Sequence, residues 1–162
     1  MPKKQQSGST PATLALTAAG IGFELHHYEH DPRAASYGLE AAEALGVEPA
    51  RVFKTLLANL DGALVVGIVP VDGQLDLKAL ARSLGGSRAV MAEVSAAERA
   101  TGYVAGGISP VGQKKPHRTV LDASALAHAT IFVSGGRRGL DLEMTPADLV
   151  AITEAITAQI GR

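Results

Sequence analysis

Apolar and polar positions follow two different periods along the chain, and each period predicts a different kind of element. Two runs with strand-like composition, at 51–60 and 63–69, are separated by Asp61-Gly62. A two-residue Asp-Gly link between such runs is typical of a β-hairpin. Shorter strands are predicted at 23–27, 89–91, 119–121, 131–134 and 140–144.

Capping residues predict where the helices begin and end. The predicted helices start at Thr10-Pro11, Ser36 and Asp76, and they stop at Gly20, Gly46 and Gly85-Gly86 respectively. A further helix is predicted from a capping box formed by Ser95 and Glu98, and it ends at Gly102. The last helix has Thr145 as its cap and Pro146 at its first position, with Leu149, Ile152, Ile156 and Ile160 at helical spacing.

The order of these elements indicates one α+β domain. Helices and strands alternate irregularly, and the hairpin requires antiparallel pairing, which argues against a doubly wound parallel sheet. A chain of 162 residues fits a single core. We therefore expect a flexible N-terminal tail at residues 1–9 and one folded domain at residues 10–162.

Composition narrows the chemistry that the chain can perform. It contains no cysteine, which excludes disulfides, thiolate metal sites and a protein thiol as nucleophile. Apolar residues make up 46% of the sequence, as in folded globular proteins. The first ten residues are polar, and no apolar run approaches the roughly 20 residues of a membrane span. We expect a cytoplasmic protein without a membrane segment.

The formal net charge is only −1, so nothing attracts nucleic acid to the molecule as a whole. Two local basic clusters stand out, Lys114, Lys115, His117 and Arg118 in one and Arg137 with Arg138 in the other. Each cluster is either a set of contacts to RNA phosphates or a solvated loop, and the sequence alone leaves both interpretations open.

Lys54 is the most informative anomaly in the pattern. On a strand at 51–60 it shares one face with Val52, Leu56, Ala58 and Leu60, which are all apolar. Burying an ammonium is unfavourable unless an anion or a carbonyl oxygen meets it. The alternative is an edge strand on which the lysine stem packs while its amine reaches water.

Two glycine-rich stretches are candidates for ligand-binding loops. The first is Gly106-Gly107-Ile108-Ser109-Pro110-Val111-Gly112, and the second is Ser134-Gly135-Gly136-Arg137-Arg138-Gly139. Clustered glycines allow backbone N–H groups to approach a ligand oxygen closely. The first stretch matches neither a nucleophile elbow nor a P-loop, and either stretch could equally be a plain turn.

The histidines do not predict a metal site. His26, His27 and His30 are close in sequence, but they form no metal-binding helix motif and no thiolate is present. No Ser/His/Asp triad can be selected without an arbitrary choice. We predict neither a metal nor a cofactor.

Four motifs resemble those of the YbaK/EbsC family and occur in the same order as in that family. The family is related to the editing domain of bacterial prolyl-tRNA synthetases. The four motifs are Tyr28-Glu29-His30-Asp31, Arg51-Val52-Phe53-Lys54-Thr55-Leu56, Gly107-Ile108-Ser109-Pro110-Val111-Gly112 and Ser134-Gly135-Gly136-Arg137-Arg138-Gly139. The resemblance spans roughly residues 10–160. It implies a mixed, mostly antiparallel and partly barrel-like sheet surrounded by helices, with an active-site crevice.

The resemblance also implies the site. Lys54 matches the family's essential lysine, and substrate-binding positions match Tyr28, Tyr37, Thr55, Gly107, Ile108, Ser109, Gly112, Ser134, Gly136 and Asp141. The implied activity is trans-editing: removal of cysteine from Cys-tRNA(Pro), with Cys-tRNA(Cys) as a further substrate and prolyl-tRNA synthetase as a suggested partner. Because the chain has no thiol and no recognisable triad, the nucleophile would come from elsewhere, and the thiol of the substrate would attack its own ester.

Two alternatives stay open. A related freestanding enzyme would clear Ala-tRNA(Pro) with an activated water. A module of another class would bind aminoacyl-tRNA, a nucleotide or a protein without catalysis.

Overall fold

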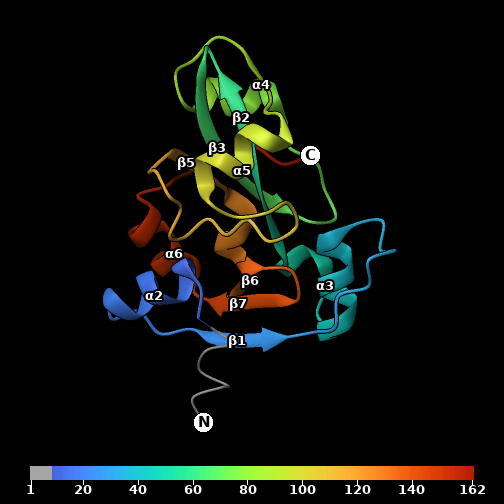
Figure 1. Ribbon diagram of the computed structural model, residues 1–162. Helices are drawn as coiled ribbons and strands as arrows, with labels where there is room; N and C mark the ends of the chain where they lie inside the picture. The colour runs from blue at the N-terminus through green and yellow to red at the C-terminus, as the bar shows by residue number, and fades with distance from the viewer. Residues whose placement is uncertain (1–8) are drawn as a thin grey trace.

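The computed structural model describes residues 9–162, so the tail predicted for residues 1–9 lies outside the described residues except for Ser9. Two β-sheets form the centre of the molecule, and helices lie around them (Figure 1). The predicted α+β class, with mixed and mostly antiparallel pairing, is confirmed. The strands are divided between two sheets rather than placed in one.

The larger sheet is built on the predicted hairpin. Its strands are β4 (Ala89–Met91), β2 (Phe53–Leu60), β3 (Ala63–Pro70), β5 (Arg118–Asp122) and β8 (Ile156–Ala158), in that spatial order. β2 pairs antiparallel with β3 and β4, whereas β5 runs parallel to both β3 and β8. Asp61 and Gly62 both adopt positive φ, which fits the right-handed twist of a two-residue hairpin link.

The smaller sheet is antiparallel throughout. It consists of β1 (Glu24–His27), β7 (Leu140–Met144) and β6 (Ile131–Arg137), with β7 in the middle. A parallel bridge between Val52 and Phe132 connects this sheet to the start of β2. Large aliphatic side chains from both sheets, including Ile68, Leu121 and Leu142, are fully buried in a shared core.

Most helices begin where their caps predict. They are α2 (Pro11–Ala18), α3 (Tyr37–Leu45), α4 (Leu77–Ser83), α5 (Val94–Thr101) and α6 (Pro146–Thr153), with short 3-10 turns at Pro49–Arg51 and Ala123–Ala127. Thr10, Ser36, Asp76 and Thr145 each accept the expected capping hydrogen bond. None of the helices within residues 9–162 has the length and apolar character needed to cross a membrane.

The capping box predicted at the start of α5 is wrong. The helix begins two residues earlier, with Glu93 rather than Ser95 at the cap position, and no side chain caps it. Glu98 instead accepts a hydrogen bond from the backbone N–H of Ala105, at 2.8 Å. A tertiary contact with the following loop has thus replaced the local one.

The predicted extent of the last helix is also wrong. α6 ends at Thr153 because Glu154 adopts a left-handed conformation, with φ of 56°. Ile156 then lies in β8 beside Val120 of β5, and Ile160 is fully buried beyond it. The helical spacing of these apolar residues is therefore a coincidence. Ile156 belongs to a strand and Ile160 to the segment after it.

Candidate functional site

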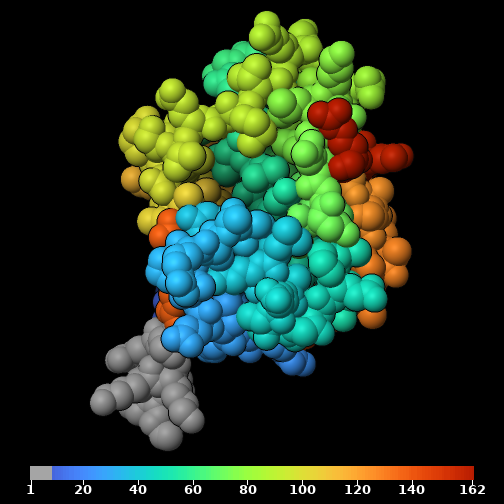
Figure 2. Space-filling model, turned by 90° about the vertical axis from the view of Figure 1, so that its right-hand side faces the viewer, coloured from blue at the N-terminus to red at the C-terminus, as the bar shows by residue number. Residues whose placement is uncertain are grey.

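A cavity of about 390 Å³ lies along the edge of β2 that faces away from β3. On this edge the neighbouring strand changes from β6 to β4. At its start β2 bridges to β6 through Val52, whereas β4 pairs only with residues 58–60. Between these points, no strand among residues 9–162 pairs with residues 53–57 along that edge. Figure 2 shows this face, with the teal of β2 visible between the blue to cyan segment around α3 and the yellow of α5.

The open edge of β2 presents backbone groups as well as side chains. The carbonyl of Leu57 accepts a hydrogen bond from Ala92 on this side. Backbone groups in an antiparallel strand alternate between its two neighbours. Phe53 and Thr55 therefore direct their N–H and C=O groups toward the gap, which explains why consecutive residues from Val52 to Leu57 all line the cavity.

The cavity brings together most of the predicted site. Seven of the predicted residues line it, namely Tyr28, Tyr37, Lys54, Thr55, Ile108, Ser134 and Asp141. They come from six separate places in the sequence, spread over more than a hundred residues. The resemblance had implied one crevice for these positions, and the geometry supplies one.

Lys54 lies half-buried on the cavity wall, opposite Val69 of β3. Burial lowers the pKa of its ammonium group, and the carboxylate of Asp72 partly opposes that effect. Among residues 9–162, the ion pairs within 4 Å do not include Lys54. Its amine is thus available to a carbonyl or anionic ligand in the cavity.

Thr55 carries a buried side-chain hydroxyl that lacks a hydrogen-bond partner among the described residues. Leaving a buried hydroxyl unpaired costs about 1–3 kcal/mol. Thr55 is among the residues that line the cavity, and its Oγ1 is buried beside it.

Asp141 and Tyr28 form the polar corner of the cavity. Asp141 is 5% exposed and pairs with Ser134 across the β6–β7 ladder. Burial raises the pKa of its carboxyl to about 7. Burial, and then the nearby Asp141, raise the pKa of the Tyr28 phenol to about 12. Asp141 can therefore exchange a proton near neutral pH, whereas Tyr28 stays protonated and can donate a hydrogen bond.

The remaining predicted positions lie behind the cavity wall. Ser109 is fully buried, and its Oγ accepts from the N–H of Val111. Close packing requires glycine at the other three positions. At Gly107 a Cβ would lie 2.6 Å from the Arg137 Cα, and at Gly112 it would lie 2.6 Å from the Pro11 carbonyl oxygen. At Gly136 it would lie 2.9 Å from the Thr10 Cβ. These residues shape the loops behind Ile108 and Ser134, and a direct contact with substrate stays a prediction for them.

Sequence reasoning missed several parts of the wall. Gly38, Val71, Met91, Val94, Ala97 and Ala105 also line the cavity. Most are apolar or glycine residues, which carry no chemical signal in a sequence. Gly38 does carry a sequence signal, because a glycine early in a helix suggests close packing. In the structure a Cβ at this position would lie 2.2 Å from Val71 Cγ1.

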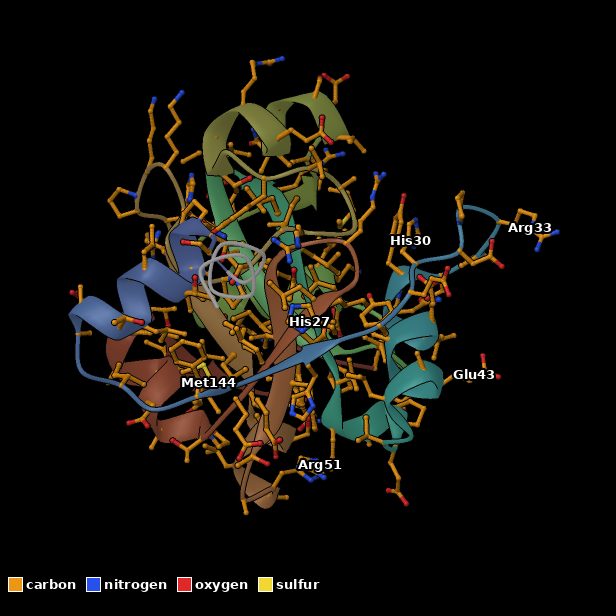
Figure 3. The ribbon with its side chains drawn as sticks, turned by 60° about the horizontal axis from the view of Figure 1, so that its bottom comes forward. His27, His30, Arg33, Glu43, Arg51 and Met144 are labelled. Carbon is orange, nitrogen blue, oxygen red and sulfur yellow. The ribbon has the colours of Figure 1, made fainter. Side chains whose placement is uncertain are left out.

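A group of possible metal ligands lies outside the cavity, on the smaller sheet. Glu24, His26 and Glu143 place their ligand atoms within 4.8 Å of one another. Glu143 is already engaged by His26 at 2.9 Å, by Thr130 at 2.6 Å and by the guanidinium of Arg51 at 3.5 Å. Arg51, at the lower edge of Figure 3, supplies the positive charge that this carboxylate needs.

Comparison with known families decides the assignment. The aminoacyl-tRNA editing domain model matches residues 31–152, which contain Lys54, both glycine-rich stretches and most of the cavity. The chain belongs to the aminoacyl-tRNA editing domain family. The resemblance to the YbaK/EbsC proteins is thereby confirmed, and family membership makes aminoacyl-tRNA the class of substrate.

Relatives of this editing domain agree in sequence and in fold. EbsC of Enterococcus faecalis (strain ATCC 700802 / V583), to which Cys-tRNA(Pro)/Cys-tRNA(Cys) deacylase activity is ascribed, is 40% identical over 121 residues, covering 74% of this chain and 73% of EbsC. A structure ascribed to a trans-editing enzyme for prolyl-tRNA synthetase aligns with a TM-score of 0.83 and 27% identity, covering 95% of this chain and 98% of that one. The hypothetical protein APE2540 aligns with a TM-score of 0.85 and 26% identity, covering 94% and 100%.

Proposed function

We propose that this editing domain removes cysteine from mischarged Cys-tRNA(Pro), and also acts on Cys-tRNA(Cys). One observation carries the proposal: a half-buried lysine and, next to it, a threonine whose buried hydroxyl has no partner within residues 9–162 both line one cavity in a chain without cysteine. The activity ascribed to EbsC supports cysteine as the amino acid.

The substrate itself supplies the nucleophile in this scheme. The thiol sulfur of the cysteinyl group attacks the ester carbonyl carbon, so that a carbon–sulfur bond forms and the bond to the ribose oxygen breaks. The proton of the thiol ends on that ribose oxygen, and the products are a cyclic thiolactone and free tRNA. Holding the acyl group in a folded conformation accelerates such an intramolecular step strongly.

The protein contributes position and charge rather than a covalent bond. In its ammonium form, Lys54 stabilises the negative charge that develops on the carbonyl oxygen. The Thr55 hydroxyl, which has no hydrogen-bond partner within residues 9–162, donates to an oxygen of the ester or the ribose. Asp141 accepts a hydrogen bond from the α-amino group of the amino acid.

Asp141 also favours a second candidate, the hydrolysis of Ala-tRNA(Pro) by water. A carboxyl with a pKa of about 7 can act as a general base near neutral pH. An alanyl ester has no thiol and would need such a base. The two candidate functions therefore depend on different residues of the same cavity: the thiol mechanism needs no protein base, whereas the hydrolysis needs Asp141 as its base.

Deacylation of three charged tRNAs separates the possibilities. We expect the order Cys-tRNA(Pro) well above Ser-tRNA(Pro) and Ala-tRNA(Pro), since neither of the last two esters carries a thiol. Preferential cleavage of the alanyl ester, abolished by Asp141→Asn, would replace the thiol mechanism with the hydrolytic one. Tight tRNA binding without cleavage of any ester would show a non-catalytic binding module.

Prolyl-tRNA synthetase is the partner that we propose for delivery of the tRNA. The structural relative described above is ascribed that trans-editing role. The net charge of −1 gives this chain little attraction of its own for RNA. Addition of the synthetase should therefore lower the KM for Cys-tRNA(Pro), and an unchanged KM would speak against the partnership.

A further inference from the structure

Arg138 occupies a defined place at the mouth of the cavity. It lies in the turn between β6 and β7, and its side chain is exposed. Its Nε donates a hydrogen bond to the carbonyl oxygen of Ala105 at 2.8 Å. Its Cζ lies 5.1 Å from the ring centroid of Tyr37. Both contacted residues line the cavity, so the guanidinium belongs to the rim.

The surroundings of Tyr37 hold this arrangement in place. A Cβ added at Gly106 would lie 2.6 Å from Tyr37 Cδ1, so the ring packs directly on that glycine. The His30 ring lies 5.8 Å away, between the centroids. Figure 3 places His30 where the chain leaves β1, whereas Arg33 projects from the tip of the next loop into solvent. The Tyr37 ring therefore contacts residues from two separate loops, and the guanidinium packs over it.

The terminal nitrogens of Arg138 are left for a ligand. Within residues 9–162, its hydrogen bonding is limited to the Nε contact, and no carboxylate lies within 4 Å of it. A planar guanidinium with two free amino groups binds phosphate oxygens in a bidentate manner. Because it is stacked on an aromatic ring beforehand, little side-chain freedom is lost when the anion binds.

We propose that Arg138 binds the phosphodiester immediately 5′ of the acylated nucleoside. This rests on the proposed function, in which the ester lies in the cavity near Lys54. The phosphate that precedes the terminal nucleoside must then leave through the mouth, where Arg138 stands. Arg138 would thus hold the RNA side of the substrate, while Lys54 and Thr55 hold the acyl side.

Two small substrates isolate this single phosphate. One is cysteinyl-adenosine, which carries the ester but no phosphate. The other is the cysteinyl dinucleotide CpA, which differs by one nucleoside and one phosphodiester. We expect Arg138→Met to lower kcat/KM about tenfold on cysteinyl-CpA through a higher KM, as for one lost charge-assisted hydrogen bond. On cysteinyl-adenosine the change should stay below about twofold. The methionine preserves an unbranched stem over Tyr37.

Two further variants complete the test. Arg82→Met removes another exposed arginine, on α4, and should leave both substrates unaffected because no residue of that helix lines the cavity. Arg138→Lys keeps the charge but loses the planar fork, so it should retain part of the preference for CpA. Equal losses on both substrates would show that Arg138 only supports Tyr37, and would overturn the proposal. Cleavage of neither substrate by the wild-type protein would instead overturn the proposed function.

Discussion

Lys54 and Thr55 are adjacent on β2, and the partial burial of an ammonium and the burial of an unpaired hydroxyl both disfavour folding. Lys54→Met removes the charge and keeps the length of the stem. We expect it to lower kcat/KM on Cys-tRNA(Pro) by about a hundredfold or more, as when one oxyanion-stabilising group is lost. Its free energy of unfolding in urea should equal or exceed that of the wild type, because a partly desolvated ammonium is removed. Unfolding at unchanged activity per folded molecule would refute the assignment.

Thr55→Val tests the unpartnered hydroxyl. Valine has the same shape and removes the unsatisfied oxygen, so we expect the protein to become more stable by about 1 kcal/mol while activity falls. Thr101→Val is the matched control. Thr101 is also buried, but its Oγ1 donates to Ala97 and accepts from Tyr103, so this substitution should be destabilising. Urea unfolding of both variants checks the contrast, and a destabilised Thr55→Val would mean that the hydroxyl has a partner.

Asp141 predicts an unusual dependence of stability on pH. Its pKa is raised from 3.8 to about 7 by burial, so the folded protein keeps a proton that the unfolded chain releases. The stabilising contribution is therefore complete below about pH 4 and is lost as the pH rises to about 7. The loss is on the order of 4 kcal/mol. Subtracting the urea stability of Asp141→Asn at each pH isolates this effect, and parallel profiles for the two proteins would contradict it.

The candidate site could be predicted only where a residue was chemically out of place. Lys54 interrupts an apolar strand face, and that anomaly is visible in the sequence. Met91 and Val71 also line the cavity, but an apolar residue in an apolar pattern has nothing to distinguish it. The resemblance to a family supplied Tyr28 and Asp141, whose nearness depends on pairing between strands that are far apart in sequence.

At the scale of elements, α3 depends on one glycine for its position. A Cβ at Gly38 would meet Val71 Cγ1 at 2.2 Å, so Gly38→Ala should destabilise the protein by about 1–3 kcal/mol despite the better helix propensity of alanine. In a Val71→Ala background the contact with Cγ1 is removed but the Val71 Cβ still lies 2.7 Å from the added Cβ, so the same change should be less destabilising than in the wild type. Gly22→Ala, at an open position, serves as the control. A double-mutant cycle from urea unfolding gives the coupling, and additive effects would exclude this contact.

Elements that are determined locally were predictable from the sequence. The β2–β3 hairpin and the capped starts of α2, α3, α4 and α6 all follow from a few neighbouring residues. β8 was not predictable in this way. Its three residues form a strand only because β5 offers a parallel edge, and β5 lies more than thirty residues earlier in the chain.

At the scale of the whole molecule, the division into two sheets creates the site. β2 is bridged to the smaller sheet at Val52 and paired with β4 from Ala58, and the cavity occupies the interval between them. No periodicity in the sequence shows where one strand exchanges its neighbours. The sequence therefore indicates a lysine in need of a partner, whereas only the topology shows the space in which the partner binds.

The charge distribution of the molecule predicts how activity depends on salt. With a net charge of −1, only local contacts can bind RNA, and we take three exposed side chains as candidates, Arg138, Lys114 and Lys115, because Arg118 already donates to the carbonyl of Leu84. Each contact to single-stranded RNA contributes about −0.7 to the slope of log kcat/KM against log salt concentration. Three contacts therefore give a slope of roughly −2, which lowers kcat/KM about 20-fold between about 50 and 200 mM salt. The double substitution Lys114→Gln and Lys115→Gln should make the slope shallower by about 1.4. Cysteinyl-adenosine, which has no phosphate, should show almost no salt dependence. An unchanged slope in the double variant would mean that the RNA leaves the cavity in another direction.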